Sequence, residues 1–193
     1  MKKLLILLTF ILSLYSCNGQ DNTKRIIFKY PKDQFILDSV SLKSKTKHFK
    51  VVTLEKNDKK NKHNAQHNSN PIIILVKDNG KYYKAFQNNK IIFSYDDNCP
   101  ADGYGSIVSK NNYFTIEQIF CSDFLFVKSY TTFKINDNET ITLHKYGEEF
   151  TDRSDPDKKI LSKIWTKKDF GEINFEVVTE NFLLKLRLTK PKK

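Results

Sequence analysis

The sequence contains little alanine, glycine or proline. Only three alanines (Ala65, Ala85 and Ala101), six glycines and five prolines occur among its 193 residues. Alanine is the best helix former, so its scarcity argues against a helical bundle. The low glycine and proline content excludes a collagen-like or low-complexity protein. Seventeen asparagines and 15 phenylalanines favour β-strands joined by polar turns.

Arginine is also scarce, because Arg25, Arg153 and Arg187 are the only three, although the formal net charge is +11. Nucleic-acid recognition favours arginine, whose guanidinium binds phosphates and base edges in a bidentate manner. The lysines are scattered and form no dense block flanked by stacking aromatic residues. We therefore expect a solvated, lysine-rich surface and no nucleic-acid partner. A weak attraction to anionic lipid or polysaccharide is the alternative.

The N-terminus has the pattern of an export signal. Lys2 and Lys3 precede an apolar run over residues 4–14, which is too short to span a membrane comfortably but typical of a secretory signal. The sequence Leu-Tyr-Ser-Cys at residues 14–17 resembles the lipobox of bacterial lipoproteins. The alternative is an ordinary signal peptide in which Cys17 is incidental.

The lipobox resemblance implies cleavage before Cys17 and diacylglycerol on its thiol, with further acyl chains such as palmitate. Several acyl chains together give stable anchoring. We expect a signal peptide at residues 1–16, a lipidated cysteine and tether at 17–25, and a folded part at 26–193. Surface-exported lipoproteins resemble each other in an acidic cluster after the cysteine, whereas Asp21 is the only acid between Asn18 and Lys24. The expected location is thus the cell envelope, at the outer membrane and facing the periplasm.

The folded part has the pattern of an antiparallel β-meander. Strand-like runs with Asn- or Asp-rich turns recur about every ten residues, and Asn79-Gly80 is a strong hairpin signal. The expected strands lie at residues 35–42, 49–54, 71–76, 81–86, 91–95, 106–108, 113–120, 124–135 and 140–144. We predict a single all-β domain, a sandwich or barrel-like sheet with at most one short helix.

Two regions interrupt this pattern. Residues 56–70 hold no large apolar residue, which predicts a long mobile loop between strands. Thr166 to Asp169 has the form of a capping box and predicts one helical turn ended by Gly171. Two last strands are expected at 175–178 and 184–188, with a helix over 180–188 as the alternative for the second.

Cys99 and Cys121 are the only cysteines besides Cys17. In an oxidising compartment two thiols often pair. Cys99 precedes one expected strand and Cys121 ends the next, so the two lie at the same end of a hairpin. Both a disulfide and a pair of unlinked, buried cysteines fit this pattern.

No arrangement of residues points to a catalytic or metal site. Asp96, Asp97 and Asp102 are weak candidates for a calcium loop, because Pro100 stands where a third ligand is needed. His63 and His67 are four residues apart but lack the adjacent glutamate of zinc proteases. We assign no catalytic residue, no metal and no cofactor. An enzyme would need a cleft with convergent polar groups, such as Asp96, Asp97, Asp102 and His144 meeting in space.

Four segments resemble small lipoproteins of unknown function from flavobacteria and their relatives. They lie at residues 113–118 (YFTIEQ), 132–134 (TFK), 143–147 (LHKYG) and 165–171 (WTKKDFG). The resemblance implies a lipoprotein but no activity, so no catalytic residue follows from it. The function we expect is that of an envelope-anchored binding or structural module whose partner is an envelope protein or glycan. An envelope hydrolase and an immunity-type inhibitor of a toxin are the alternatives.

Overall fold

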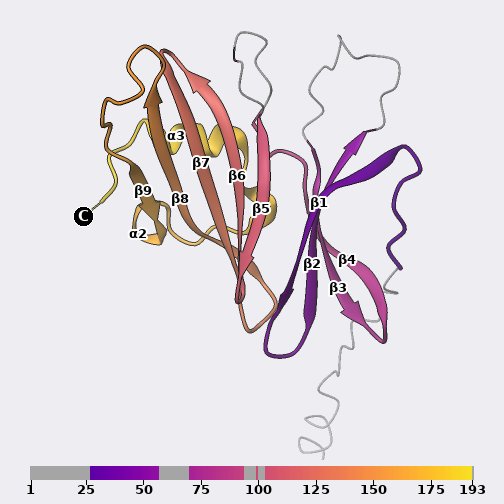
Figure 1. Cartoon of the computed structure of the whole chain (residues 1–193). Helices are drawn as coiled ribbons and strands as arrows, with labels where there is room; N and C mark the ends of the chain where they lie inside the picture. The colour runs from indigo at the N-terminus through magenta and orange to yellow at the C-terminus, as the bar shows by residue number, and fades with distance from the viewer. Residues whose placement is uncertain (1–26, 57–69, 94–98, 100–102, 193) are drawn as a thin grey trace, which may run out of the picture.

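The computed structural model describes residues 27–56, 70–93, 99 and 103–192. Its strands form two antiparallel meanders, each with neighbouring strands in sequence order (Figure 1). The first sheet contains β1 (Gln34–Lys43), β2 (His48–Lys56), β3 (Ile72–Asp78) and β4 (Lys81–Asn88). The second contains β5 (Tyr104–Lys110), β6 (Tyr113–Ser122), β7 (Leu125–Ile135), β8 (Ile141–Asp152) and β9 (Lys163–Thr166). The predicted all-β sandwich is confirmed.

The sequence explains the hairpins. Asn79 and Gly80 adopt φ values of 46° and 77°, which is the left-handed pair that a two-residue hairpin between β3 and β4 requires. Asn111, at φ 56°, turns β5 into β6. Asparagine tolerates this region better than other non-glycine residues, so these two turns set the register of the β3–β4 and β5–β6 hairpins.

The main core lies between the sheets and includes side chains from both of them and from α3 (Glu180–Arg187). β3 is buried on both faces, because Ile72, Ile74 and Val76 point into this core while Ile73 and Leu75 belong to a second cluster. That second cluster lies on the outer face of the first sheet and includes Val52 and Leu54 of β2. The continuous apolar sequence of β3 fits the burial of this strand on both faces.

The two sheets meet along β1 and β5. The carboxylate of Asp38 in β1 accepts hydrogen bonds from the Ile107 amide (2.8 Å) and the Tyr104 hydroxyl (2.9 Å), both in β5. Burial raises the pKa of Tyr104 well above its ordinary value, so this hydroxyl stays a donor. One side of the sandwich is thereby closed by polar contacts.

The chain crosses between the sheets through residues 91–93, which are buried but form no strand. Gln118 of β6 holds this crossing, because its Oε1 accepts from the Phe93 amide (2.7 Å) and its Nε2 donates to the Ile91 carbonyl (3.2 Å). The strand predicted at 91–95 is therefore wrong over 91–93. Residues 94 and 95, and most of the predicted loop at 56–70, lie outside the described residues.

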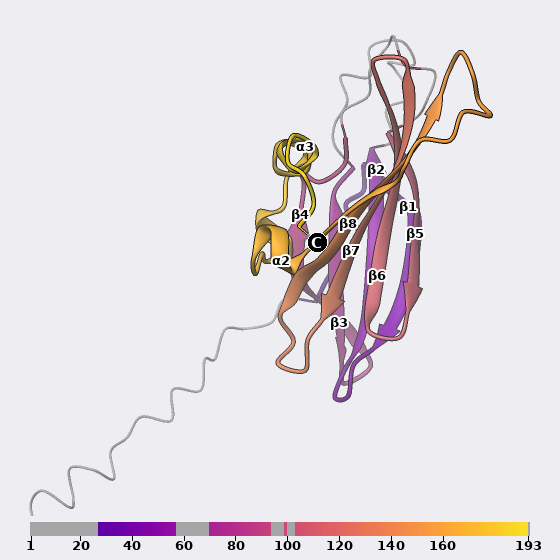
Figure 2. The same ribbon diagram turned by 90° about the vertical axis from the view of Figure 1, so that its left-hand side faces the viewer.

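The C-terminal segment closes the other side of the sandwich and lies along one edge of the two sheets (Figure 2). It contains α2 (Lys167–Phe170), the 3₁₀-helix η2 (Phe175–Val177) and α3. The capping box predicted at Thr166–Asp169 is present, and Gly171 ends α2 at φ 77°. The Asn88 side chain of β4 donates to the carbonyls of Phe175 (2.6 Å) and Val178 (2.7 Å). These bonds fix η2 against the first sheet.

The strands predicted at 175–178 and 184–188 are wrong, and the alternative helix over 180–188 is the one that forms. Thr179 caps α3 by accepting from the Phe182 amide. Leucines at 184, 186 and 188 alternate as in a strand, but the buried pair is Leu183 and Leu186, which lie on one helical face. Leu188 is 88% exposed. The alternation of leucines at this helix end therefore does not indicate a strand.

Candidate functional site

Most candidate site residues named from the sequence lie outside the residues that the structure describes. Cys17, the three aspartates at 96, 97 and 102, and the two histidines at 63 and 67 all lie outside the described residues. Within the described part, no group of three or more His, Cys, Asp or Glu residues could hold a metal ion. His144 lies on β8, 4.9 Å from the Tyr113 ring. Burial and the nearby Lys145 and Lys134 lower the pKa of His144, so its described surroundings are basic.

Cys99 and Cys121 form a disulfide in the structure, with their Cα atoms 5.5 Å apart. Cys99 is buried and Cys121 lies near the end of β6. The bond ties the segment that leads into β5 to the strand with which β5 pairs. It is therefore a structural link within one hairpin.

Removing this disulfide is expected to destabilise the protein. The chain-entropy model assigns about 3 kcal/mol to a closed loop of this size. The double variant Cys99→Ser, Cys121→Ser should unfold at lower denaturant than the oxidised wild type and match the reduced wild type. Two titratable thiols in oxidised, denatured protein in addition to any at Cys17 would contradict the bridge.

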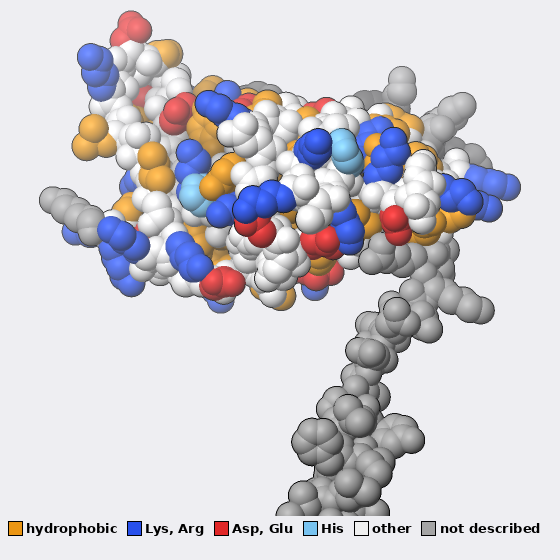
Figure 3. Space-filling view, turned by 90° about the horizontal axis from the view of Figure 1, so that it is seen from below, with side chains coloured by type: hydrophobic (Ala, Val, Ile, Leu, Met, Phe, Trp, Pro, Cys, Tyr) orange, Lys and Arg blue, Asp and Glu red, His pale blue; other side chains and the backbone are white. Residues whose placement is uncertain are grey.

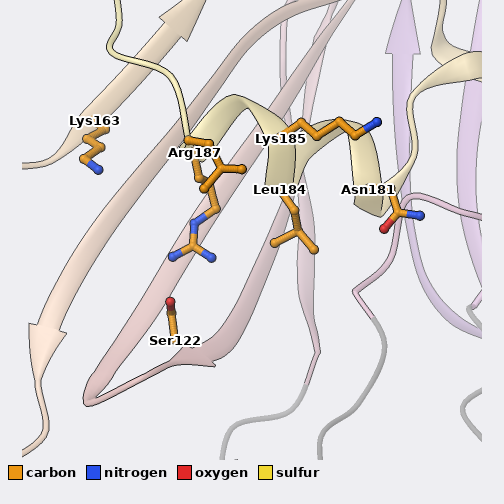
Figure 4. A pocket seen from close by; sticks show the side chains of 7 residues that line it. Ser122, Lys163, Asn181, Leu184, Lys185 and Arg187 are labelled. Atoms are coloured by element: carbon orange, nitrogen blue, oxygen red, sulfur yellow. The ribbon is translucent and has the colours of Figure 1, made fainter.

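An open cleft of roughly 470 Å³ lies where α3 passes over the second sheet (Figure 4). Three elements contribute to it: the end of β6, the start of β9, and α3 with the residue that follows it. The lining residues are Ser122, Lys163, Asn181, Leu184, Lys185, Arg187 and Leu188. Three of the seven are basic and none is acidic.

Arg187 is the basic side chain of the cleft that other side chains hold in a fixed orientation. Its Nε lies 2.8 Å from Oε1 of Glu148, whose side chain is fully buried, and 3.1 Å from Oε2. Its guanidinium also stacks over the Phe120 ring, 4.9 Å from the ring centroid. Figure 4 shows the end of the guanidinium pointing toward Ser122. The buried carboxylate and the ring thus hold Arg187 in one orientation, with its terminal nitrogens at the cleft.

Glu148 belongs to β8, and a neighbouring side chain of the same strand holds its carboxylate in place. The Tyr146 hydroxyl donates to Glu148 Oε1 at 2.6 Å, and the Tyr146 ring stacks on Trp165. Burial raises the pKa of Glu148, whereas the bonds from Tyr146 and Arg187 and the charge of Lys163 act to lower it. The same burial, with the neighbouring Glu148, raises the pKa of Tyr146 far above its ordinary value. Tyr146 is therefore a permanent donor to the carboxylate at physiological pH.

The lysines of the cleft are exposed and differ in direction. Lys163 stands across from Glu148 in the β8–β9 pair, and its ammonium lies 5.5 Å from the Phe150 ring centroid. In Figure 4, Lys185 extends along α3 toward Asn181. The cleft therefore presents one fixed guanidinium and two adaptable ammonium groups.

This set of groups suits binding better than catalysis. Fixed N–H donors and positive charge recognise carboxylate, phosphate or sulfate groups. A nucleophilic Ser122 would need a base to take its proton. Arg187 stays protonated and cannot serve, the lining residues include no histidine or carboxylate, and Figure 4 shows the side chains of Lys163 and Lys185 apart from Ser122.

Sequence reasoning did not find this cleft. Ser122, Lys163 and Arg187 lie on three elements separated by dozens of residues, and lysine and serine are common on any surface. The only available signal was the rarity of arginine, because a chain with 30 lysines and three arginines uses arginine selectively. Figure 3 shows that the described basic side chains on the face seen from below are dispersed.

Comparisons with known proteins add no relative. No family model, no curated protein sequence and no solved structure matches the chain. Within the described residues, no helix is long and apolar enough to cross a membrane.

Proposed function

We propose that this protein is an envelope lipoprotein, anchored through Cys17 at the outer membrane, and that its β-sandwich is a binding module. Two features support the two parts of this proposal. The charged start, apolar run and cysteine at the N-terminus have lipoprotein spacing. The guanidinium of Arg187, fixed by Glu148, faces an open cleft that Lys163 and Lys185 flank. That fixed guanidinium is the observation that carries the binding role.

The ligand class follows from the lining. A group with negative charge, such as a carboxylate or phosphate on an envelope glycan or protein, fits one fixed guanidinium and two ammonium groups. Leu184 and Leu188 add apolar surface beside these charges. An uncharged partner would leave Arg187 without a counterpart on the cleft side.

The anchor is tested by Cys17→Ala. We expect the wild type to fractionate with membranes and into detergent, and the variant to stay unprocessed or become soluble, because the acyl chains provide the membrane affinity. Cys99→Ser with Cys121→Ser is the matched control, since it removes two other cysteines and should leave the fractionation unchanged. A Cys17→Ala protein that fractionates like the wild type, together with no lipid mass on the N-terminus, would reject the anchor.

The cleft is tested by titrating the lipidated protein in detergent with inorganic phosphate and with glucuronic acid. Amide NMR shifts of Ser122 and Asn181 should move with at least one of the two anions. Lys163→Gln should weaken that binding about tenfold, as expected for one charged hydrogen bond. Lys45→Gln is the control, because Lys45 is exposed and pairs with Asp137 far from the cleft. Equal effects of the two substitutions, or no shift with either anion, would reject the cleft as a binding site.

A further inference from the structure

Exposed apolar side chains are concentrated where the described chain begins. Five of the large hydrophobic residues lie 38–46% exposed within the eleven residues 27–37. They are Ile27, Tyr30, Phe35, Ile36 and Leu37. We call these five the N-terminal patch. Scattered exposed hydrophobic residues are ordinary, but five within one short segment indicate a surface that contacts another molecule or a membrane.

The structure shows how this segment is held on the outer face of the first sheet. Phe28 donates its amide to the Tyr82 carbonyl (2.9 Å) and packs against the second apolar cluster. Its ring also contacts that of Tyr30, 5.0 Å away between centroids. The segment is thus docked, and Ile27 and Tyr30 flank the docked Phe28. Figure 1 shows this segment running along the outer side of the first sheet into β1.

The start of β1 extends the same surface. Ile36 pairs with Leu54 of β2, a member of the outer cluster, and residues opposite each other in an antiparallel pair share a face. Phe35 pairs with Glu55 and so points to the opposite face, as does Ile27 opposite Tyr83, a residue packed against the main core. The bulge between Ile36 and Asp38 lies at Leu37. Within the N-terminal patch, Tyr30 and Ile36 therefore lie on the outer face beside the outer cluster, whereas Ile27 and Phe35 lie at the two edges of the first sheet.

Position and charge indicate what covers the patch. Ile27 follows Cys17 by only ten residues, which a fully extended chain spans in about 34 Å. Lys29 and Lys32 are exposed within the patch, against a single acid, Asp33. Exposed aromatic and aliphatic side chains mixed with lysines are typical of a surface in the headgroup region of a bilayer. Anionic lipids attract such lysines.

We infer that the N-terminal patch rests against the lipid headgroups of the membrane that holds Cys17. This inference depends on the proposed lipid anchor and adds an orientation to it. The outer face of the first sheet is turned to the bilayer. The cleft beside α3, which lies on the second sheet, then stays open to the periplasm.

The orientation is tested with lipidated full-length protein in vesicles of phosphatidylethanolamine and phosphatidylglycerol that carry bromine on the acyl-chain carbons next to the headgroups. Bromine quenches tryptophan emission only at close range. The native Trp165 is fully buried in the second sheet and provides the background. Tyr30→Trp and Ile36→Trp each place a tryptophan in the N-terminal patch. Leu161→Trp is the matched control, because Leu161 is 88% exposed in the segment before β9, on the second sheet.

We expect brominated lipid to cause a loss of emission from Tyr30→Trp and Ile36→Trp that exceeds the loss from wild type and from Leu161→Trp. Equal quenching of all three variants, or none above wild type, would overturn the orientation. The mass of the N-terminal peptide is measured on the same samples. Protein without lipid on Cys17 would overturn the anchor and with it the orientation, whereas lipidated protein without selective quenching would overturn the orientation alone.

Discussion

Phe175→Ala is expected to lower the free energy of unfolding by about 3–5 kcal/mol, the usual cost of truncating a fully buried phenylalanine. The Phe175 ring is 1% exposed and lies 5.1 Å from the Phe133 ring and 6.1 Å from the Phe114 ring, centroid to centroid. Those two rings belong to β7 and β6, whereas Asn88 of β4 holds the Phe175 backbone from the other sheet. The side chain therefore fills the space where η2 closes the sandwich.

Val177→Ala is the matched control, because Val177 belongs to the same 3₁₀-helix but is 62% exposed. We expect it to change the unfolding free energy by no more than about 0.5 kcal/mol. Equilibrium denaturation followed by the emission of Trp165 measures both variants. If Phe175→Ala unfolded at the same denaturant concentration as Val177→Ala, η2 would not be part of the cooperative core.

The regular part of the fold could be predicted because its signals are local. Asn79-Gly80 sets a hairpin by backbone conformation alone, and Thr166 with Asp169 satisfies its own helix start. The continuous apolar run at Ile72 predicts a buried strand without reference to any partner. Each of these signals involves residues only a few positions apart.

The conformation of residues 91–93 and 175–178 could not be predicted because it depends on side chains that are distant in the sequence. Residues 91–93 are as apolar as a strand, but Gln118 occupies the hydrogen-bonding groups that a strand would use. Residues 175–178 have strand-forming composition, yet the Asn88 side chain binds the carbonyls of Phe175 and Val178 instead. In both places a single amide side chain from another element overrides local propensity.

The candidate site also depends on residues that are far apart in the sequence. Ser122, Lys163 and Arg187 are brought together by the pairing of β6 through β9 and by the packing of α3. The glutamate that orients Arg187 lies 39 residues before it. Because β9 has only four residues and the sequence favours a strand over 184–188, no local pattern predicts that these side chains lie near one another.

Glu148→Ala should also be strongly destabilising, by about 3–5 kcal/mol, because it removes one partner of a buried ion pair. The Glu148 side chain is 0% exposed and that of Arg187 is 18% exposed. The substitution leaves the guanidinium without its carboxylate and the Tyr146 hydroxyl without its acceptor. It should also weaken anion binding in the cleft, since Arg187 would lose the contact that orients it.

The exposed pair Lys167–Glu172 provides the matched control, because both side chains are 64% exposed. Glu172→Ala should cost no more than about 1 kcal/mol, as surface ion pairs do. The double variant Glu148→Leu, Arg187→Met should recover most of the stability that Glu148→Ala loses, because it leaves no unpaired buried charge. It should not recover anion binding. A double variant as unstable as Glu148→Ala would mean that Tyr146, not Arg187, is the group that depends on Glu148.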